Sequence, residues 1–411
     1  MEFDCFGLFK IVSANMKILY IHQYFITPKE PGGTRSYWIA QEMIKQGHEV
    51  VMLTASSKFE EKIKRVTIDG IKVIYVKEEY DQKMSIFKRL LVFVKFMIKS
   101  TMIAYKEKEI ELVVATSTPL TIGFPALILK WFKRIPYVFE VRDLWPEVPI
   151  QMGALKNPLI KFLAVGFEKL IYKNAVHIIA LSPGMQEGVA KFVPKEKISM
   201  IPNMSKKDEF WPRSRNIEFL KSLHIKEDSF KIVHFGSLGL ANGADTIIES
   251  ARLLKEDSSI EFLFVGGGST EQELKDICTK DNIQNVKFLG KFSMEDTSEI
   301  VNFSDVSIVS FKDLPILYTN SPNKLFDSLS AGKPIIVNSN GWTKNLVEKY
   351  ECGFYVNPNE PMDLVQRIKY LQNHPDIAMK MGVNSRMLAA NKYDKSILTK
   401  EFVEVIEKYH V

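Results

Sequence analysis

A basic side chain at the start of a short predicted helix is the clearest candidate for chemistry in this sequence. The segment from Ser321 to Pro334 reads SPNKLFDSLSAGKP. Ser321 suits a helix N-cap, Pro322 suits the first helical position, and Gly332 followed by Pro334 ends the helix. The first N–H groups of a helix lack partners within it and carry partial positive charge. The segment therefore predicts an anion-binding helix terminus.

Lys324 and Asp327 lie on the same side of this predicted helix. A cation in the first turn is unfavourable beside the positive end of the helix dipole, unless an anion lies between them. A phosphate would satisfy both the ammonium and the backbone N–H groups. The Asp327 carboxylate could accept two hydroxyl groups, as a ribose presents them. An ordinary capped helix with a solvated lysine and aspartate explains the segment about equally well.

Glycine turns follow several predicted strands. Gly32 and Gly33 stand between the first strand and a helix, and Gly266 and Gly267 follow a strand in the second half. Glycine allows a ligand phosphate to approach the backbone closely, although a simple loop turn is the alternative. Arg35, in the first turn of the helix after Gly33, is placed either to reach an anion or to be merely exposed.

A second charged group, Glu140, Arg142 and Asp143, stands at the end of a middle strand. Ligands gather at the carboxyl ends of strands in α/β sheets. Asp143 could orient an acceptor hydroxyl or accept its proton, with Arg142 and Glu140 beside it. A structural arginine–carboxylate pair that stabilises the loop is almost as good an explanation.

Strands and helices alternate along the chain, which predicts parallel sheets with helices on both faces. Each half opens with a strand, a glycine loop and a helix, so we expect two separate nucleotide-fold units rather than one large sheet. The predicted strands are 17–24, 48–54, 73–76, 112–115, 137–141 and 177–180 in the first half and 231–235, 260–265, 286–288, 306–310 and 334–338 in the second.

The boundary between the two units is predicted near residue 204. We expect one domain at 16–204, a second at 205–394 and a C-terminal helix at 395–411 that can cross back to the first domain. Residues 1–15 precede a second methionine, Met16, and lack the basic start of a secretory signal. We expect them to be a non-native or disordered extension, with Met16 as the natural start.

Composition excludes several classes of protein. The 411 residues are 46% hydrophobic and 25% charged, as in globular proteins, which excludes a disordered chain, a collagen-like repeat and a coiled coil. The three cysteines are far apart, which predicts no disulfide framework or metal site and favours a reducing compartment. The longest uncharged stretch, 112–129, is interrupted by proline and threonine and predicts a strand, loop and helix rather than a membrane span.

The charge is uneven along the chain. Residues 1–205 carry 29 basic and 20 acidic side chains, which suggests an anionic partner. Residues 87–108 predict a basic amphipathic helix, and basic residues flank the aromatic pair Trp131 and Phe132, so we expect this half to bind an anionic membrane surface. A core helix with a solvated face is the alternative. Nucleic acid is disfavoured, because no nucleic-acid motif or stacking platform is present.

Taken together, these residues resemble the retaining nucleotide-sugar glycosyltransferases of family 4, which have the GT-B fold. The resemblance covers nearly the whole chain from Met16. Two stretches, 143–146 (DLWP) and 321–324 (SPNK), are most similar to transferases of bacterial O-antigen, capsule and colanic acid assembly. Some of those enzymes transfer N-acetylated amino sugars such as N-acetylfucosamine. The matching pieces, in the family's order, are Gly32-Gly33, Arg142-Asp143, Ile201-Pro202-Asn203, Gly236 with Gly243, the glycines after Val265, and the helix Asn323–Pro334.

The resemblance implies two Rossmann-like domains that face each other across a cleft. The first would bind a lipid-linked saccharide acceptor and the second a UDP-sugar donor, without a metal or another cofactor. The enzyme would work in the cytoplasm on the inner face of the plasma membrane. Catalytic roles fall on Asp143, Arg142 and Glu140. Donor contacts fall on Gly32, Gly33, Arg35, Ser237, Asn242, Gly266, Gly267, Lys291, Thr319, Asn320, Ser321, Asn323, Lys324 and Asp327.

The sequence departs from the family pattern at two places. The family has two glutamates separated by seven residues; the second corresponds to Asp327, whereas the first corresponds to Thr319, beside Asn320. The family also has an arginine and a lysine on the loop after the first strand of the second domain, where this chain has Ser237 and Asn242. Lys324, the helix terminus and Arg142 are therefore expected to neutralise more of the donor diphosphate.

Two other functions fit the same sequence. A nucleotide-sugar epimerase of this architecture would convert the donor without an acceptor. A non-catalytic module would bind anions or nucleic acid through the basic half. Acceptor-dependent release of UDP distinguishes the three.

Overall fold

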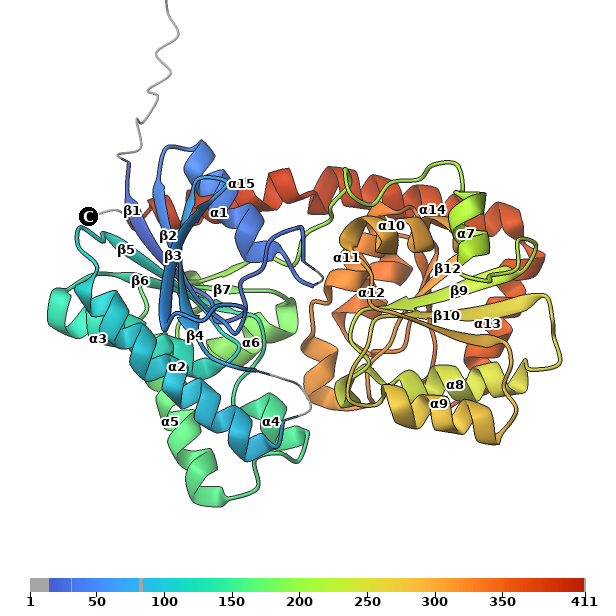
Figure 1. Ribbon diagram of the computed structural model, residues 1–411, viewed down its shortest axis with the longest axis horizontal. Coiled ribbons are helices and arrows are strands. Elements are labelled where there is room, and N and C mark those ends of the chain that lie inside the picture. The colour runs from blue at the N-terminus through green and yellow to red at the C-terminus, as the bar shows by residue number, and fades with distance from the viewer. Residues whose placement is uncertain (1–14, 31, 81–83, 410–411) are drawn as a thin grey trace, which may run out of the picture.

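Two parallel-stranded sheets organise the chain (Figure 1). The computed structural model describes residues 15–30, 32–80 and 84–409. The first sheet has the order β3-β4-β2-β1-β5-β6-β7-β8 and is parallel except for the antiparallel edge strand β3. Its strands are β1 (Lys17–Ile21), β2 (Glu49–Ser56), β3 (Ile63–Ile68), β4 (Ile71–Lys77), β5 (Leu112–Thr116), β6 (Tyr137–Val141), β7 (His177–Ala180) and β8 (Ile198–Met200).

The second sheet has the order β11-β10-β9-β12-β13-β14, and all its strand pairs are parallel. The prediction of two α/β units with separate sheets is therefore confirmed. The strands of this second sheet are β9 (Phe230–Phe235), β10 (Ile260–Val265), β11 (Val286–Gly290), β12 (Val306–Val309), β13 (Ile335–Val337) and β14 (Gly353–Tyr355).

Helices cover both faces of each sheet (Figure 1). No helix in the described ranges combines the length and the apolar character that crossing a bilayer requires. The first domain has α1 (Arg35–Lys45), α2 (Ile86–Lys106), α3 (Gly123–Lys133), α4 (Glu147–Gln151), α5 (Pro158–Asn174) and α6 (Pro183–Ala190). The second has α7 (Ile217–Ser222), α8 (Ala244–Leu253), α9 (Glu271–Lys280), α10 (Met294–Phe303), α11 (Asn323–Ser330), α12 (Trp342–Lys349), α13 (Pro361–Asn373) and α14 (Pro375–Leu388), before the final helix α15 (Lys395–Glu407).

The predicted strands have mainly apolar sequences, interrupted by single charged residues such as Lys231, Glu261 and Lys287. Every residue of β5 and β10 is buried, as expected for central strands covered on both faces. The strands that sequence reasoning missed are β3, β8 and β14, which are edge strands in their sheets. β3 (IKRVTI) is charged and partly exposed, and the other two have three residues each, so none shows a long apolar run.

The chain crosses between the domains at two adjacent places. The first crossing is the linker after β8, and the second leads into α15, which runs back over the first domain (Figure 1). Ser205 joins them: its N–H donates to the Tyr393 carbonyl (2.7 Å), and its carbonyl accepts from the Lys395 N–H (2.8 Å). At the far end of α15, Glu407 Oε1 lies 3.1 Å from His48 Nε2 of the first domain.

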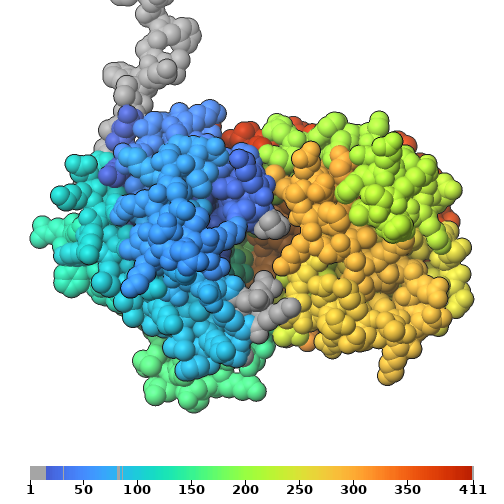
Figure 2. All heavy atoms as spheres, in the orientation of Figure 1, coloured from blue at the N-terminus to red at the C-terminus, as the bar shows by residue number. Residues whose placement is uncertain are grey.

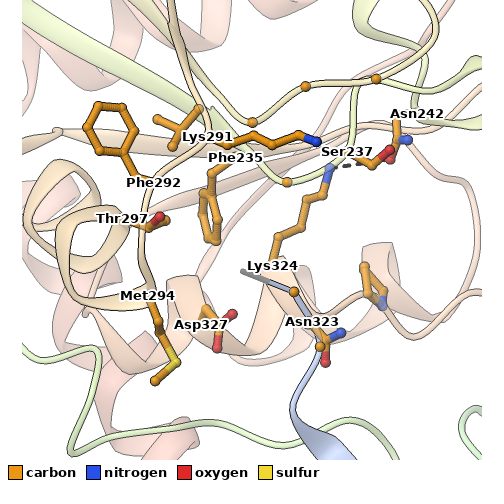
Figure 3. Close-up of a pocket in the computed structure, with 18 of the residues that line it drawn as sticks. Phe235, Ser237, Asn242, Lys291, Phe292, Met294, Thr297, Asn323, Lys324 and Asp327 are labelled. Carbon is orange, nitrogen blue, oxygen red and sulfur yellow. Dashed lines mark hydrogen bonds between the residues drawn. The ribbon is translucent and has the colours of Figure 1, made fainter. Parts of the chain in front are cut away.

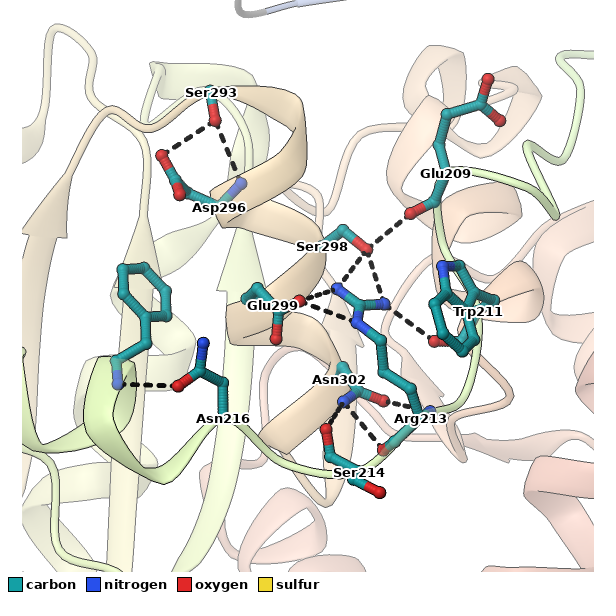
Figure 4. A network of polar contacts seen from close by, with 11 residues as sticks. Glu209, Trp211, Arg213, Ser214, Asn216, Ser293, Asp296, Ser298, Glu299 and Asn302 are labelled. Carbon is teal, nitrogen blue, oxygen red and sulfur yellow. Dashed lines mark hydrogen bonds and ion pairs between the residues drawn. The ribbon is translucent and has the colours of Figure 1, made fainter.

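The segment after the linker is fixed to α10 by Arg213 (Figure 4). Its guanidinium pairs with Glu299 at 2.6 Å, and its N–H donates to Asn302 Oδ1 at 3.1 Å. Ser298 Oγ donates to the Glu209 carbonyl at 2.7 Å. These contacts hold residues 206–210, which reach the cleft described below, against the second domain.

The expected N-terminal extension, residues 1–15, lies outside the described residues except for Asn15. Met16 is already part of the core: it is 1% exposed, and its N–H donates to His48 Nδ1 at 3.1 Å.

We predict that Phe402→Ala lowers the free energy of unfolding by about 3–5 kcal/mol, because a fully buried phenyl group of α15 is lost from the core. Chemical denaturation measures the loss. Lys400→Ala on the exposed side of α15 is the matched control and should change stability by less than about 0.5 kcal/mol. Equal effects of the two changes would mean that α15 does not dock as described.

Candidate active site

A cleft of about 1380 Å³ lies between the two domains (Figure 2). Its walls are formed by loops at the carboxyl ends of β6, β9, β10 and β11, by the loop between β1 and α1, and by the first turns of α10 and α11. This is where parallel α/β sheets place their ligands.

The ammonium of Lys324 is buried on the second-domain side of the cleft (Figure 3). Its Nζ lies 3.3 Å from His234 Nε2 and 3.4 Å from Asn242 Oδ1. Burial lowers the pKa of Lys324 to about 7. Burial and the nearby ammonium also hold the pKa of His234 well below its usual value, so this imidazole is neutral. Among the described residues, no carboxylate forms an ion pair with Lys324, which leaves its ammonium available to an external anion.

Helix α11 begins at Asn323, one residue later than predicted, and Ser321 is not its cap. Ser321 Oγ accepts from the Asn203 N–H at 3.1 Å, and the Ser321 carbonyl accepts from the Asn203 amide. Ser321 therefore ties α11 to the linker. No side chain caps the first turn of α11, so its N–H groups remain available to a ligand in the cleft.

Glycine permits close contact between the domains at the cleft. A Cβ at Gly33 would lie 2.8 Å from Asn323 Nδ2 and 3.7 Å from Arg142 Nη2. The loop after β1 thus touches the first residue of α11. Gly32 has a φ of +136° and also lines the cleft. On the opposite wall, a Cβ at Gly236 would meet the Lys324 side chain at 3.5 Å.

The glycine turn after β10 packs directly on the loop after β9. A Cβ at Gly266 would lie 1.8 Å from the Gly236 carbonyl oxygen, and one at Gly268 would lie 2.2 Å from the Leu238 carbonyl oxygen. These glycines are needed for backbone packing, and together with Gly267 they line the cleft. Lys291, after β11, extends toward the loop that carries Ser237 (Figure 3).

Asp327 lines the cleft but is paired. Its Oδ1 lies 3.0 Å from Lys206 Nζ, and both side chains are buried. Burial raises the pKa of Asp327, and the Lys206 ammonium opposes that rise. Sequence reasoning did not single out Lys206, because it stands in a polar linker segment with no motif around it.

An apolar compartment adjoins these charged groups, and sequence reasoning missed most of it. Phe235, Met294 and Phe210 line the cleft together with Phe292, the first three being contributed by β9, α10 and the linker segment (Figure 3). Phe210 stacks on Phe235 with ring centroids 6.2 Å apart. Such side chains are indistinguishable from core residues in a sequence. Only their position at strand ends could have indicated a ligand role.

Arg142 and Asp143 line the opposite wall of the cleft. Arg142 Nη1 lies 3.3 Å from His22 Nε2, and burial together with this guanidinium lowers the pKa of His22 far below its usual value. Asp143 Oδ2 accepts from Thr118 Oγ1 at 2.9 Å. Burial raises the pKa of Asp143, while Thr118 and Arg142 oppose the rise. Within the described ranges, no group of three or more His, Cys, Asp or Glu side chains could hold a metal ion.

Arg35 and Glu140 do not line the cleft, in contrast to the expectation that they contact substrates. Their side chains are fully buried and form an ion pair with Nε and Oε1 2.7 Å apart. Arg35 also donates to the carbonyls of Ile201 (3.0 Å) and Pro202 in the linker. Burial would raise the pKa of Glu140, but the nearby arginine charges lower it overall. The pair is structural, with Arg35 rather than Arg142 as the main partner.

Thr319 also lies outside the residues that line the cleft, whereas Asn320 lines it. Thr319 Oγ1 donates to the Ile316 carbonyl at 2.7 Å, and its own carbonyl accepts from Ser182 Oγ of the first domain. A Cβ at Gly184 would meet Thr319 Cγ2 at 2.8 Å. Thr319 therefore forms a contact between the domains, and its expected donor contact is not supported by this position.

Two family models match successive parts of the chain. The model "Glycosyl transferase 4-like domain" matches residues 32–204, and "Glycosyl transferases group 1" matches residues 216–387. The boundary between them coincides with the linker after β8. Together the two matches span most of the chain.

Similar proteins point to the same family. The "Probable glycosyltransferase WbjE" of Pseudomonas aeruginosa is 24% identical over 299 residues, which is 69% of this chain and 72% of that protein. The "Putative colanic acid biosynthesis glycosyl transferase WcaI" of Escherichia coli strain K12 is 22% identical over 395 residues, covering 90% of this chain and 93% of that protein.

Solved structures share the whole fold. Sucrose-phosphate synthase from Thermosynechococcus elongatus superposes with a TM-score of 0.76 at 17% identity, over 96% of this chain and 99% of that one. Anabaena Alr3699/HepE in complex with UDP and glucose superposes with a TM-score of 0.70 at 18% identity, over 95% of this chain and 99% of that one.

We predict that the affinity of the cleft for inorganic pyrophosphate, used as a probe anion, falls as the pH rises from about 7.5 to about 9. The anion binds the protonated form of Lys324, whose pKa in the free protein is about 7. Above that pH most of the lysine is neutral, so it must take up a proton when the anion binds, and this weakens the observed affinity. Affinity measured by calorimetry should fall by up to about tenfold per pH unit. Lys324→Met should weaken binding about tenfold or more at pH 7 and remove this slope. A slope that persists in Lys324→Met would contradict the assignment.

We predict that Glu140→Gln destabilises the fold by about 3–5 kcal/mol, because it leaves the Arg35 guanidinium buried without its counter-charge. The folded variant should bind the same probe anion within about twofold of the wild-type affinity. Asp143→Asn is the contrasting variant, because Asp143 lines the cleft. It should lower the rate of sugar transfer and leave the free energy of unfolding nearly unchanged. Loss of transfer by a fully stable Glu140→Gln protein would restore a catalytic role for Glu140.

Proposed function

Because two glycosyltransferase family models together span most of this chain and its fold is GT-B, we propose that it transfers a sugar from a UDP-sugar to a lipid-linked saccharide with retention of anomeric configuration. The observation that carries the donor assignment is the buried Lys324 ammonium at the uncapped start of α11. Such a group is satisfied by a ligand phosphate, and Alr3699/HepE, of the same fold, is a UDP complex.

The donor diphosphate would lie between Lys324 and the loop of Gly32 and Gly33. Lys291 and Arg142 also line the cleft and add positive charge from both domains. Asn242 stands where the family has a basic residue. Its Oδ1 accepts a hydrogen bond from Lys324 Nζ at 3.4 Å, so Asn242 helps to orient the Lys324 ammonium. This arrangement supports the expectation that Lys324 neutralises a larger share of the donor diphosphate charge here than in relatives with the two additional basic residues.

The nucleoside would occupy the apolar compartment beside Asp327. Phe235 and Phe292 offer apolar surface for a nucleobase, and the Asp327 carboxylate can accept the ribose hydroxyls. Burial raises the pKa of Asp327, and the ion pair with Lys206 opposes that rise and favours the carboxylate form.

The acceptor hydroxyl would approach from the first domain. Asp143 is the acid that this domain contributes to the described cleft lining, and its hydrogen bond from Thr118 fixes its orientation. The acceptor oxygen forms a bond to the anomeric carbon, and the bond to the diphosphate oxygen breaks with its electron pair. The acceptor proton passes to that leaving oxygen on the same face, with Asp143 orienting the hydroxyl. Contact between Gly33 and Asn323 helps to exclude water.

The proposed acceptor class is supported by the names of relatives rather than by the cleft, and the proposed location is inferred from the family resemblance. WbjE and WcaI are glycosyltransferases by name, and WcaI is named for colanic acid biosynthesis. We propose a role in the assembly of a bacterial surface polysaccharide such as O-antigen or capsule, on the cytoplasmic face of the plasma membrane. An N-acetylated amino sugar is the donor sugar that the family resemblance favours.

We predict that one member of a panel of UDP-hexoses and UDP-N-acetylhexosamines releases UDP only when a bacterial lipid extract is added. A coupled assay measures UDP, and Lys324→Met should reduce the rate at least about tenfold because it removes a charge-assisted bond. Conversion of the donor without any extract would instead indicate an epimerase. If no UDP-sugar raises the melting temperature while a different nucleotide sugar does, the UDP assignment is wrong.

A further inference from the structure

The first domain exposes its large apolar side chains almost entirely on three neighbouring helices, α2, α3 and α5. Six of them have exposed fractions from 58% to 75%: Phe87 and Met102 on α2, Phe132 on α3, and Leu159, Phe162 and Leu163 on α5. Among the described residues of this domain, Ile63 is the one exposed large apolar side chain outside these helices. Such a concentration marks an interaction surface rather than scattered exposure.

The three helices form one face. Phe124 of α3 contacts Phe167 of α5 with ring centroids 6.5 Å apart, and Lys133 at the end of α3 donates to the Glu107 carbonyl that follows α2 (3.2 Å). Figure 1 shows the helices on the same side of the first sheet. We call this surface, formed by α2, α3 and α5, the docking face.

The first turns of α5 project beyond the rest of the domain (Figures 1 and 2). Leu159, Ile160, Phe162 and Leu163 are all exposed there, so packing does not hold these turns. Instead the Asn157 side chain caps them, accepting from the N–H groups of Leu159 (2.9 Å) and Ile160 (3.2 Å). A capped helix end with apolar residues on nearly every side is built to enter an apolar environment.

The charge of the docking face identifies its partner. The three helices contain ten basic residues and one acidic residue, Glu168, which is itself buried. A second copy of the chain is a poor occupant, because two such faces would bring like charges together. An anionic lipid bilayer supplies both negative headgroups for the lysines and acyl chains for the apolar side chains.

We propose that the docking face binds an anionic lipid bilayer, with Leu159, Ile160, Phe162 and Leu163 of α5 inserted among the acyl chains and the lysines of the three helices, Lys161 included, at the headgroups. The proposal rests on the membrane location included in the proposed function and adds α5, which sequence reasoning did not identify. The face is also close to the cleft. Phe93 of α2 contacts Tyr80, which lines the cleft, with ring centroids 6.0 Å apart, so a lipid-borne acceptor has a short path to the site.

Flotation of the full chain with lipid vesicles tests the proposal. The wild-type protein should float with vesicles of phosphatidylcholine containing about 30% phosphatidylglycerol and should float poorly with phosphatidylcholine alone. Phe162→Asp combined with Leu163→Asp should lower the bound fraction at least about tenfold, because charged groups resist transfer into the acyl chains. Met379→Asp on α14 of the second domain, where the methionine is 69% exposed, is the matched control and should float like the wild type.

Three results would overturn the proposal. The wild-type chain could fail to float with anionic vesicles, or Met379→Asp could lose flotation as fully as the α5 variant. Alternatively, light scattering could show a dimer that the α5 variant converts to a monomer, in which case a second copy covers the face. An unchanged thermal shift with UDP verifies that the α5 variant is folded. Because flotation requires no substrate, its failure leaves the transfer assay intact, and failure of that assay leaves flotation intact.

Discussion

A buried ammonium without a fixed counter-charge is the interaction on which the site depends. Lys324 lies in the first turn of α11, where no side chain caps the helix and the helix dipole disfavours a cation. Its nearest polar partners, His234 and Asn242, are neutral. Burial brings its pKa to about 7, so the side chain is partly deprotonated until an anion arrives. In the proposed function, a ligand phosphate would supply the missing counter-charge. The glycine loop of the first domain already touches Asn323 at the start of α11, so that phosphate would be bound where the two domains meet.

The groups around Lys324 serve two different purposes that the sequence alone does not separate. Arg142 and Asp143 follow β6 and line the cleft, whereas Glu140 lies on β6 itself, is buried and pairs with Arg35. Arg35 of that pair also donates to the linker carbonyls of Ile201 and Pro202, so it anchors the start of the linker to the first domain. Ser321 acts in the same way on the other side, through Asn203. Polar residues near the cleft thus divide into those that meet ligands and those that hold the domains in register.

Sequence reasoning predicted the alternation of strands and helices, the two separate sheets and the group that includes Lys324, Gly33 and Asp143, because apolar runs and glycine turns are local signals. It placed Arg35, Glu140 and Thr319 at the ligand, since a charge or hydroxyl near a motif looks the same whether it points into the cleft or into the core. Lys206 and Phe210 were missed for the opposite reason. They come from an unremarkable linker segment, and only the packing of that segment on α10 by Arg213 brings them to the cleft.

The adjacency of the two chain crossings at Ser205 sets how the halves can move. Both covalent connections lie along one edge and are bonded to each other through the main chain. Two parallel tethers at a single edge resist sliding and twisting but leave rotation about their common line comparatively free. The two domains should therefore open and close by rotation about the region of Ser205, with the largest displacement on the side away from Ser205 and little change near Ser205 itself.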